Sequence, residues 1–254
     1  GDGGDRGRLD VPVGASAIET VDVFPVPTER VGSDGSGRGG TPVMVFIHGG
    51  YWLLLEKSSF SFVARGLAAH GIATVVINYA KIPQVRMAEI VRQCRQAVAW
   101  TCVNARSFGG DPDRVAVSGF SAGGHLAAMV GAEGWQPGRP LVAGYALSGL
   151  HALEPIRRSY LQKDLRLTDD DVERFSPMKI APPSTGHWLA LVGGDEGPEY
   201  LRQSSGLAAA WQTAGSRSVA FQSARGHNHF SLVTTLSDPA DPITHLIATD
   251  FLAR

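Results

Sequence analysis

Residues 119–123 read Gly-Phe-Ser-Ala-Gly and fit the pattern Gly-x-Ser-x-Gly. A serine hydroxyl becomes a nucleophile when a neighbouring base takes its proton, and this pattern is typical of a sharp turn between a strand and a helix. The pattern alone is weak because glycine and serine are common. Its context is stronger, since an apolar run at residues 115–117 leads in and a helical pattern from Ala122 leads out. The sequence therefore predicts a nucleophile elbow that aims Ser121 at the positive end of a helix.

A second motif, His-Gly-Gly-Tyr-Trp at residues 48–52, directly follows an apolar run. Acyl transfer needs backbone N–H groups aimed at the oxygen that becomes negative, and glycine lets a backbone turn without a Cβ in the way. We expect these donors from Gly49, Gly50 and Ala122, the residue after the nucleophile. Tyr51 and Trp52 are candidates for contact with an aromatic substrate, and packing beneath the loop is the equally weighted alternative.

The general base is expected after the last strand, because the triad in this arrangement follows the chain order serine, acid, histidine. Residues 225–230 read Arg-Gly-His-Asn-His-Phe and offer two histidines. We assign the base to His229 and a loop-shaping role to His227. His48 precedes the nucleophile, so we expect it to form structural hydrogen bonds.

The acid of the triad is expected after the penultimate strand, where residues 193–197 read Gly-Gly-Asp-Glu-Gly. A carboxylate there would orient His229 and stabilise its charged form. Asp195 and Glu196 are both compatible with the spacing, so the residues themselves leave this choice open. The other carboxylate is then a solvated charge in the loop.

Short apolar runs alternate with helical patterns along most of the chain, which indicates an α/β fold with a mostly parallel sheet covered by helices on both faces. Strands are expected over residues 19–25, 43–47, 73–77, 115–117, 142–147, 188–192 and 219–221. Helices are expected over residues 59–70, 87–105, 122–130, 199–214 and 243–251. Residues 1–17 read as a flexible tail, residues 18–254 as a single domain, and residues 32–40 as a glycine-rich turn within it. Residues 151–183 break the alternation and are expected to form a small helical excursion, like a cap, over the carboxyl ends of the strands.

Composition and motifs exclude several other classes of protein. A formal net charge of −1 over 254 residues gives no electrostatic case for binding nucleic acid or an anionic membrane surface. The chain has no apolar run long enough to span a bilayer and no signal-peptide pattern, so a cytoplasmic location is expected. The pair His227-x-His229 lacks a third ligand nearby, and no dinucleotide or Walker motif is present, so neither a metal nor a cofactor is expected. A homodimer is compatible with the sequence.

These residues together resemble the arylformamidase, or kynurenine formamidase, family of the α/β-hydrolase fold, within the esterase and lipase group. The resemblance runs from about Glu19 to the C-terminus. The motifs that carry it are residues 48–52, 57–60, 110–112, 121–126, 148–155 and 199–204. The register of the last of these motifs implies that Glu196 is the acid.

The resemblance implies an activity as well, namely hydrolysis of N-formylkynurenine to kynurenine and formate through a formyl-enzyme on Ser121. The chain departs from the pattern at Ala152, where relatives often carry Asp, and at Tyr51, where the lipase-like branch usually carries a third Gly. More chain is also expected before Leu9. Because a fold does not fix a substrate, a carboxylesterase or lactonase acting on another small ester or amide, possibly in specialised metabolism, is the main alternative. A catalytically inactive binding module is the alternative from another class.

Overall fold

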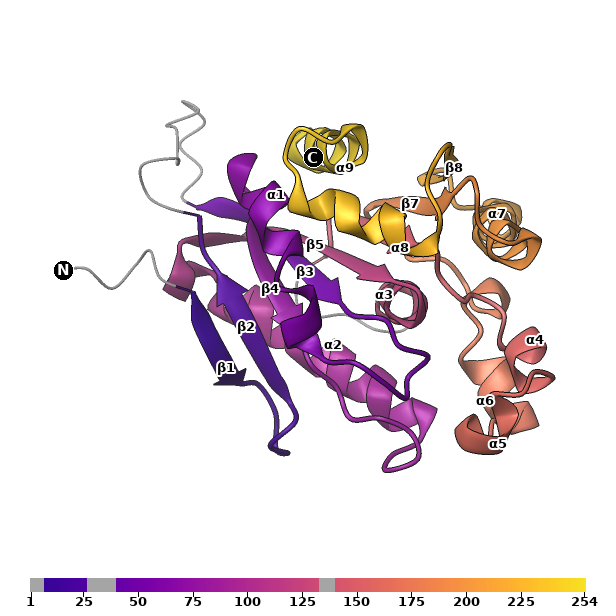
Figure 1. Ribbon diagram of the computed structural model, residues 1–254. Coiled ribbons are helices and arrows are strands. Elements are labelled where there is room, and N and C mark those ends of the chain that lie inside the picture. Colours follow the sequence, from indigo (N-terminus) through magenta and orange to yellow (C-terminus); the bar gives the residue numbers. More distant parts are fainter. Residues whose placement is uncertain (1–6, 27–39, 133–139) are drawn as a thin grey trace.

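An eight-stranded sheet forms the centre of the molecule in the computed structural model, which describes residues 7–26, 40–132 and 140–254 (Figure 1). The spatial order of the strands is β1-β2-β4-β3-β5-β6-β7-β8. Their bounds are β1 Arg8–Pro12, β2 Thr20–Phe24, β3 Thr41–Ile47, β4 Ala73–Ile77, β5 Gly110–Phe120, β6 Ala143–Leu147, β7 His187–Gly193 and β8 Val219–Ala224. The pairs β1–β2 and β2–β4 are antiparallel and all other neighbours are parallel, which confirms the predicted α/β fold.

Helices cover both faces of this sheet, so strands such as β3, β4 and β6 are buried at every residue. On one face α2 (Met87–Asn104), α3 (Ala122–Gly131) and α7 (Pro198–Thr213) contribute to one apolar core. On the other face α1 (Val63–Ala69), α8 (His229–Thr234) and α9 (Pro242–Leu252) contribute to a second core (Figure 1). Alternate residues of β3 enter the two cores, as the pleat of a strand requires. Within the described ranges, no helix is long and apolar enough to cross a membrane.

The segment between β6 and β7 forms the small helical excursion that the sequence predicted. It contains α4 (Leu153–Arg157), α5 (Gln162–Leu165), α6 (Asp169–Arg174) and the 3-10 turn η4 (Pro177–Lys179). A second 3-10 turn, η2 (Lys57–Phe60), follows β3 and its loop. Figure 1 shows α4, α5 and α6 grouped at one end of the molecule, at the side toward which the arrows of β3 and β5 point.

The N-terminal segment differs from the predicted flexible tail. Residues 8–12 form β1, the edge strand, and the backbone of Asp10 donates a hydrogen bond to the Asp22 side chain. The Lys57 ammonium bridges the Asp10 and Asp22 carboxylates at 2.6 and 2.7 Å. Val13, just after β1, packs into the core. Tertiary partners therefore order a stretch whose own composition is polar. Residues 1–6 of the predicted tail, and all of the predicted glycine-rich turn except Gly40, lie outside the described residues.

Candidate active site

Ser121 lies at the junction of β5 and α3 with φ of +57° and ψ of −119°, a region that residues with a Cβ rarely adopt. Hydrogen bonds hold this strained residue, because its N–H donates to the Leu147 carbonyl at 2.8 Å and its carbonyl accepts from His125 N–H at 3.1 Å. A Cβ at Gly119 would overlap the carbonyl of Gly123. The two glycines of the motif therefore allow the close approach of strand and helix that the turn needs.

The loop after β3 lies directly against this serine. A Cβ on Gly49 would sit 2.9 Å from the Phe120 carbonyl oxygen and 3.2 Å from Ser121 Cβ. Gly50 has φ of +115°, and its carbonyl accepts hydrogen bonds from the N–H groups of Leu53 and Leu54, which closes the loop. In the part of the chain that the structure describes, the N–H groups of Gly49 and Gly50 donate to no protein acceptor. They are available to a bound oxygen beside Ser121, as is the first N–H of α3 at Ala122.

His229 begins α8, and an N-terminal cap fixes its backbone. The Asn228 side chain accepts from the N–H groups of Phe230 and Ser231, while Ser231 Oγ accepts from Asn228 N–H. The imidazole Nδ1 lies 2.6 Å from Glu196 Oε2. This contact leaves Nε2 as the ring nitrogen that can accept a proton.

Glu196 is the acid that the structure pairs with His229. Its side chain is only 1% exposed, and its second oxygen accepts hydrogen bonds from Ser148 Oγ at 2.5 Å and from Gly193 N–H at 2.8 Å. A buried carboxylate is tolerated when such donors surround it. Asp195, by contrast, is exposed, and its backbone N–H donates to the His227 carbonyl. Of the two adjacent carboxylates, the geometry joins only Glu196 to the histidine.

Aromatic rings surround the His229 imidazole. The ring centroids of Tyr200 and Phe120 lie 4.4 and 4.6 Å from it, and Phe230 stands edge-on at 5.4 Å. The Tyr200 hydroxyl lies 2.8 Å from that of Tyr51. Burial raises the pKa of Tyr200, with its hydrogen bond to Tyr51 a further cause, so the Tyr200 hydroxyl keeps its proton.

The sequence motifs do not by themselves single out Tyr200 or Ser148 as members of the site. Tyr200 lies in α7, one turn after the acid loop, and Ser148 directly follows β6. Both fall in stretches that carry the family resemblance, and this was the only signal for them. Their partners in the structure are distant in sequence, so spacing alone gives no indication of the contacts.

Trp52 does not face a substrate site, because its side chain is fully buried. Its Nε1–H donates to His125 Nδ1 at 3.2 Å, and His125 Nε2 in turn bonds the Phe175 carbonyl at 2.6 Å. Trp52 therefore has the alternative role considered for it, packing beneath the loop. Tyr51, its neighbour, points instead to Tyr200 at the site.

His48 is a buried structural residue, as expected. Its Nδ1 lies 2.7 Å from the Gly49 carbonyl oxygen, which makes this nitrogen the donor. Burial lowers the pKa of His48 to about 4, so the ring is neutral at ordinary pH. Its ring stacks on that of Tyr79 inside the core, with centroids 4.3 Å apart, so His48 has the structural place that the sequence predicted.

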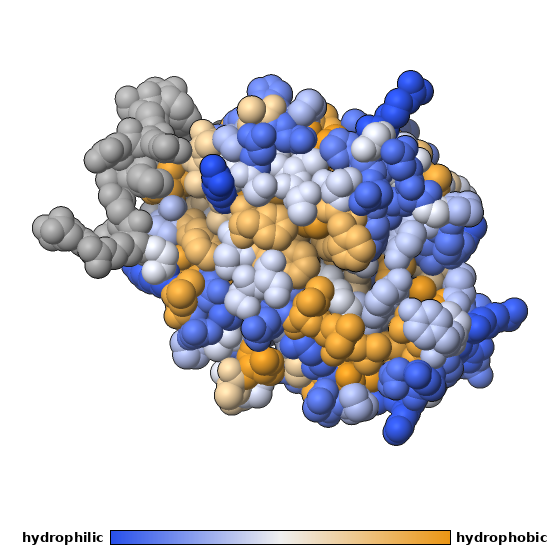
Figure 2. Space-filling view, in the orientation of Figure 1, coloured by the Kyte–Doolittle hydropathy of each residue, from blue (hydrophilic) through white to orange (hydrophobic). Residues whose placement is uncertain are grey.

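Apolar side chains border the site on the outside. Leu54 and Leu55, which follow the glycine loop, are 62% and 48% exposed, and Phe230 is 71% exposed. Figure 2 shows apolar patches over α8 and below it on this face of the molecule.

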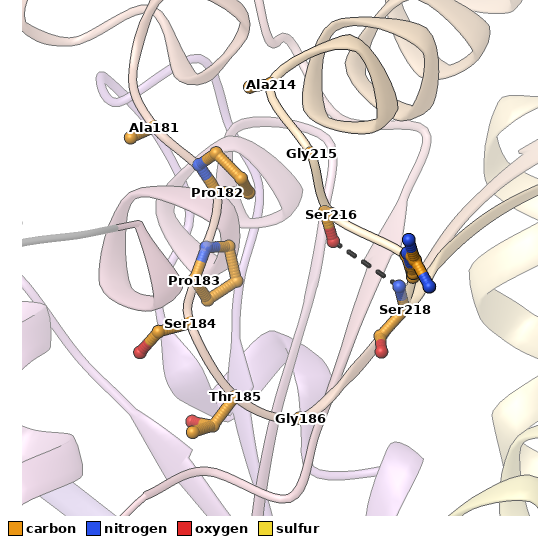
Figure 3. A pocket seen from close by; sticks show the side chains of 11 residues that line it. Ala181, Pro182, Pro183, Ser184, Thr185, Gly186, Ala214, Gly215, Ser216 and Ser218 are labelled. Atoms are coloured by element: carbon orange, nitrogen blue, oxygen red, sulfur yellow. Dashed lines mark hydrogen bonds between the residues drawn. The ribbon is translucent and has the colours of Figure 1, made fainter.

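A separate hollow of about 390 Å³ lies at the amino ends of β7 and β8. Two loops line it, residues 181–186 before β7 and residues 214–218 before β8, as Figure 3 shows. Parallel strands place their amino ends at the edge opposite their carboxyl ends, so this hollow faces away from Glu196 and His229. It is not part of the catalytic arrangement.

Comparison with known proteins identifies relatives of this chain. A model of the BD-FAE family matches residues 33–137. A kynurenine formamidase of Danio rerio is 30% identical over 248 residues, which are 94% of this chain and 80% of the relative. An isoprenylcysteine alpha-carbonyl methylesterase of Arabidopsis thaliana is 37% identical over 171 residues, 59% of this chain and 40% of that protein.

A solved structure from Silicibacter sp., provisionally described as a thioesterase, is 29% identical and superposes with a TM-score of 0.80 over 96% of this chain and 86% of its own. Relatives with hydrolase activities thus share both the sequence pattern and the fold. The Danio rerio relative extends over nearly the whole chain, including the segments that carry Ser121, Glu196 and His229. The chain is a hydrolase of the α/β-hydrolase fold and belongs to the kynurenine formamidase family.

Proposed function

We propose that this enzyme hydrolyses an aryl formamide, N-formylkynurenine, to kynurenine and formate, with Ser121 as the nucleophile. One observation carries the proposal. In a chain of this family, the strained Ser121 lies against Gly49 at the same edge of the sheet where buried Glu196 bonds His229. Nucleophile, oxyanion donors, base and orienting acid are the set of groups that acyl transfer requires.

The reaction begins when Ser121 Oγ attacks the formyl carbon and His229 Nε2 takes the hydroxyl proton. The carbonyl oxygen becomes negative, and the N–H groups of Gly49, Gly50 and Ala122 donate to it. Glu196 stabilises the imidazolium that forms. When the tetrahedral intermediate collapses, the C–N bond breaks and His229 gives its proton to the departing aryl amine.

A water molecule then attacks the formyl ester on Ser121. His229 again takes a proton and returns it to the serine oxygen as formate leaves. No redox step or metal ion is needed for this balance, because each proton removed by His229 is returned in the same half-reaction.

The aromatic groups support an aryl amine as the leaving group. Tyr51, Tyr200, Phe120 and Phe230 lie around His229, which is the residue that must protonate that amine. Aromatic rings of a substrate gain from such neighbours both by burial and by ring contacts. The Tyr51–Tyr200 hydroxyl pair offers a hydrogen-bond partner for a polar group on the substrate.

A small-ester hydrolase is the second candidate, because exposed Leu54, Leu55 and Phe230 also suit an apolar ester. The isoprenylcysteine alpha-carbonyl methylesterase of Arabidopsis thaliana is a relative whose name describes an esterase. The two functions differ in the acyl group that they favour. A formamidase needs space for hydrogen only, whereas an esterase of this second kind gains binding energy from each added methylene.

A substrate series separates the two candidates. We expect N-formylkynurenine to give the highest kcat/KM in a set that also contains p-nitrophenyl formate, acetate, butyrate and octanoate. Formyl and acetyl esters are cleaved and the octanoyl ester poorly. If kcat/KM instead rises with acyl length while N-formylkynurenine is inert, the enzyme is an esterase and the formamidase proposal is wrong.

A further inference from the structure

Tyr79, just beyond β4, contacts the glycine loop from inside the core. It is fully buried, and its hydroxyl donates to the His48 carbonyl oxygen at 2.9 Å and lies 3.5 Å from the Gly49 carbonyl oxygen. Its ring stacks on the His48 imidazole with centroids 4.3 Å apart and an interplanar angle of 10°. A single side chain thus contacts two consecutive carbonyls of the loop that borders Ser121.

These two carbonyls belong to the peptides that supply the oxyanion donors. In a planar trans peptide, the C=O of one residue and the N–H of the next point in opposite directions. The His48 carbonyl shares its peptide with Gly49 N–H, and the Gly49 carbonyl shares its peptide with Gly50 N–H. A contact that holds both oxygens in the core therefore turns both N–H groups away from the core.

The loop needs such a contact because its own backbone gives little constraint. Gly49 has no Cβ to limit its dihedral angles, and Gly50, Tyr51 and Trp52 have φ values of +115°, +51° and +61°. Three consecutive residues at positive φ are unfavourable in the absence of tertiary partners. The N–H groups of Leu53 and Leu54 fix the carbonyl of Gly50, and His48 Nδ1 holds that of Gly49 at 2.7 Å. The His48 carbonyl, on the peptide that carries Gly49 N–H, is held by the Tyr79 hydroxyl.

We propose that the Tyr79 hydroxyl is a positioning group for the oxyanion hole. It aims the Gly49 N–H through the His48 carbonyl of the same peptide, and it supports His48 Nδ1 in holding the Gly49 carbonyl, whose peptide carries the Gly50 N–H. The inference rests on the proposed acyl-transfer function. Tyr79 touches no reacting atom, so its effect is on charge that develops in the transition state and not on ground-state binding. Burial raises the pKa of Tyr79 well above its ordinary value, so the hydroxyl keeps its proton.

The test replaces Tyr79 with Phe, which removes the hydroxyl and keeps the ring that stacks on His48. With p-nitrophenyl acetate we expect Tyr79→Phe to lower kcat by roughly 10- to 100-fold, less than full loss of a donor, and to leave KM within about threefold. The affinity for a trifluoromethyl ketone, which forms a tetrahedral oxyanion on Ser121, falls by the same factor as kcat/KM. Tyr145→Phe is the matched control, because Tyr145 is also buried and its hydroxyl donates to Asp250 at 2.8 Å, away from the loop. It leaves kcat and ketone affinity unchanged.

A second variant keeps the test decisive if the Phe protein does not fold. Replacing Tyr79 with 4-aminophenylalanine retains the shape and a weaker donor, and we expect its kcat to fall several-fold at constant KM. The proposal is overturned if a folded variant at Tyr79 keeps the wild-type kcat and ketone affinity, or if Tyr145→Phe shows an equal loss. Failure of the function itself has a different signature, since Ser121→Ala would then still hydrolyse the ester.

Discussion

Glu196→Gln removes one charge from the centre of the site while preserving the shape of the side chain. The carboxylate accepts three hydrogen bonds, from His229, Ser148 and Gly193, and its side chain is 1% exposed. The amide of glutamine has one accepting oxygen and one donating nitrogen. It can therefore take one of two orientations in the same space, and each has a definite consequence.

With its oxygen toward Ser148 and Gly193, the amide keeps both of those bonds and presents NH₂ to His229 Nδ1. The imidazole must then carry its proton on Nε2, where it cannot accept one from Ser121. In the flipped orientation NH₂ faces the Gly193 N–H, a clash of two buried donors that costs about 1–3 kcal/mol. The first orientation is thus preferred, and it is the inactive one. Loss of the correct tautomer and of the charge partner costs on the order of 10⁴ in kcat in a well-studied triad, or about 5 kcal/mol.

The assay measures kcat and KM for N-formylkynurenine and p-nitrophenyl acetate, with thermal unfolding as a check on the fold. We expect Glu196→Gln to lose roughly 10³- to 10⁴-fold in kcat. Asp195→Asn is the control, because it removes the same charge from the adjacent, exposed residue, and we expect a change of less than about threefold. Mild and equal defects in the two variants would refute the assignment of the acid.

Two further predictions concern the glycine loop and the buried histidines. Gly49→Ala should lower kcat on the order of 10²-fold, because the added Cβ would press on the Phe120 carbonyl and on Ser121. Gly197→Ala, whose added Cβ meets open space, is the control. Equal kcat values for the two variants would contradict the close approach of Gly49 to Ser121. Three buried histidines have pKa values that burial lowers to between about 3 and about 4, so only the unfolded chain takes up protons as the pH falls below about 6.5. Below about pH 6.5, each of these histidines should lower the free energy of unfolding by about 1.4 kcal/mol per pH unit, down toward about pH 4, and stability is full above that window. Urea unfolding at about pH 7.5 and about pH 5 measures the effect. Equal free energies of unfolding at the two pH values would contradict the prediction. These residues are His48, His125 and His151.

Much of the fold was predictable because a parallel sheet covered on both faces leaves a direct trace in the sequence. The apolar run at residues 73–77 coincides with β4, and the helical pattern from Met87 ends within one residue of the end of α2. β1 left no such trace. It is an edge strand with mostly exposed side chains, and its order comes from partners such as Asp22 and Lys57.

The candidate site could be located from the sequence where one local motif carries one expected role. Ser121 and the glycine loop lie at strand ends, and the chain order of the triad directed attention to His229. The choice between Asp195 and Glu196 required family register, because adjacent residues in a loop have nearly the same spacing to every other element. The contacts of Tyr79 and Tyr200 were not predictable, since each joins a residue distant in sequence. Trp52 shows the same limit, because its burial against His125 depends on where α3 packs.

Turnover of N-formylkynurenine by the purified wild-type enzyme and by Ser121→Ala decides whether Ser121 hydrolyses an aryl formamide. Kynurenine is followed by its absorbance and formate by a coupled enzyme assay. We expect equal amounts of the two products with the wild type, and a fall in kcat on the order of 10⁴-fold or more in a Ser121→Ala protein that remains folded. Failure of the wild type to release kynurenine while it still cleaves p-nitrophenyl esters would contradict the claim, as would near-normal turnover by Ser121→Ala.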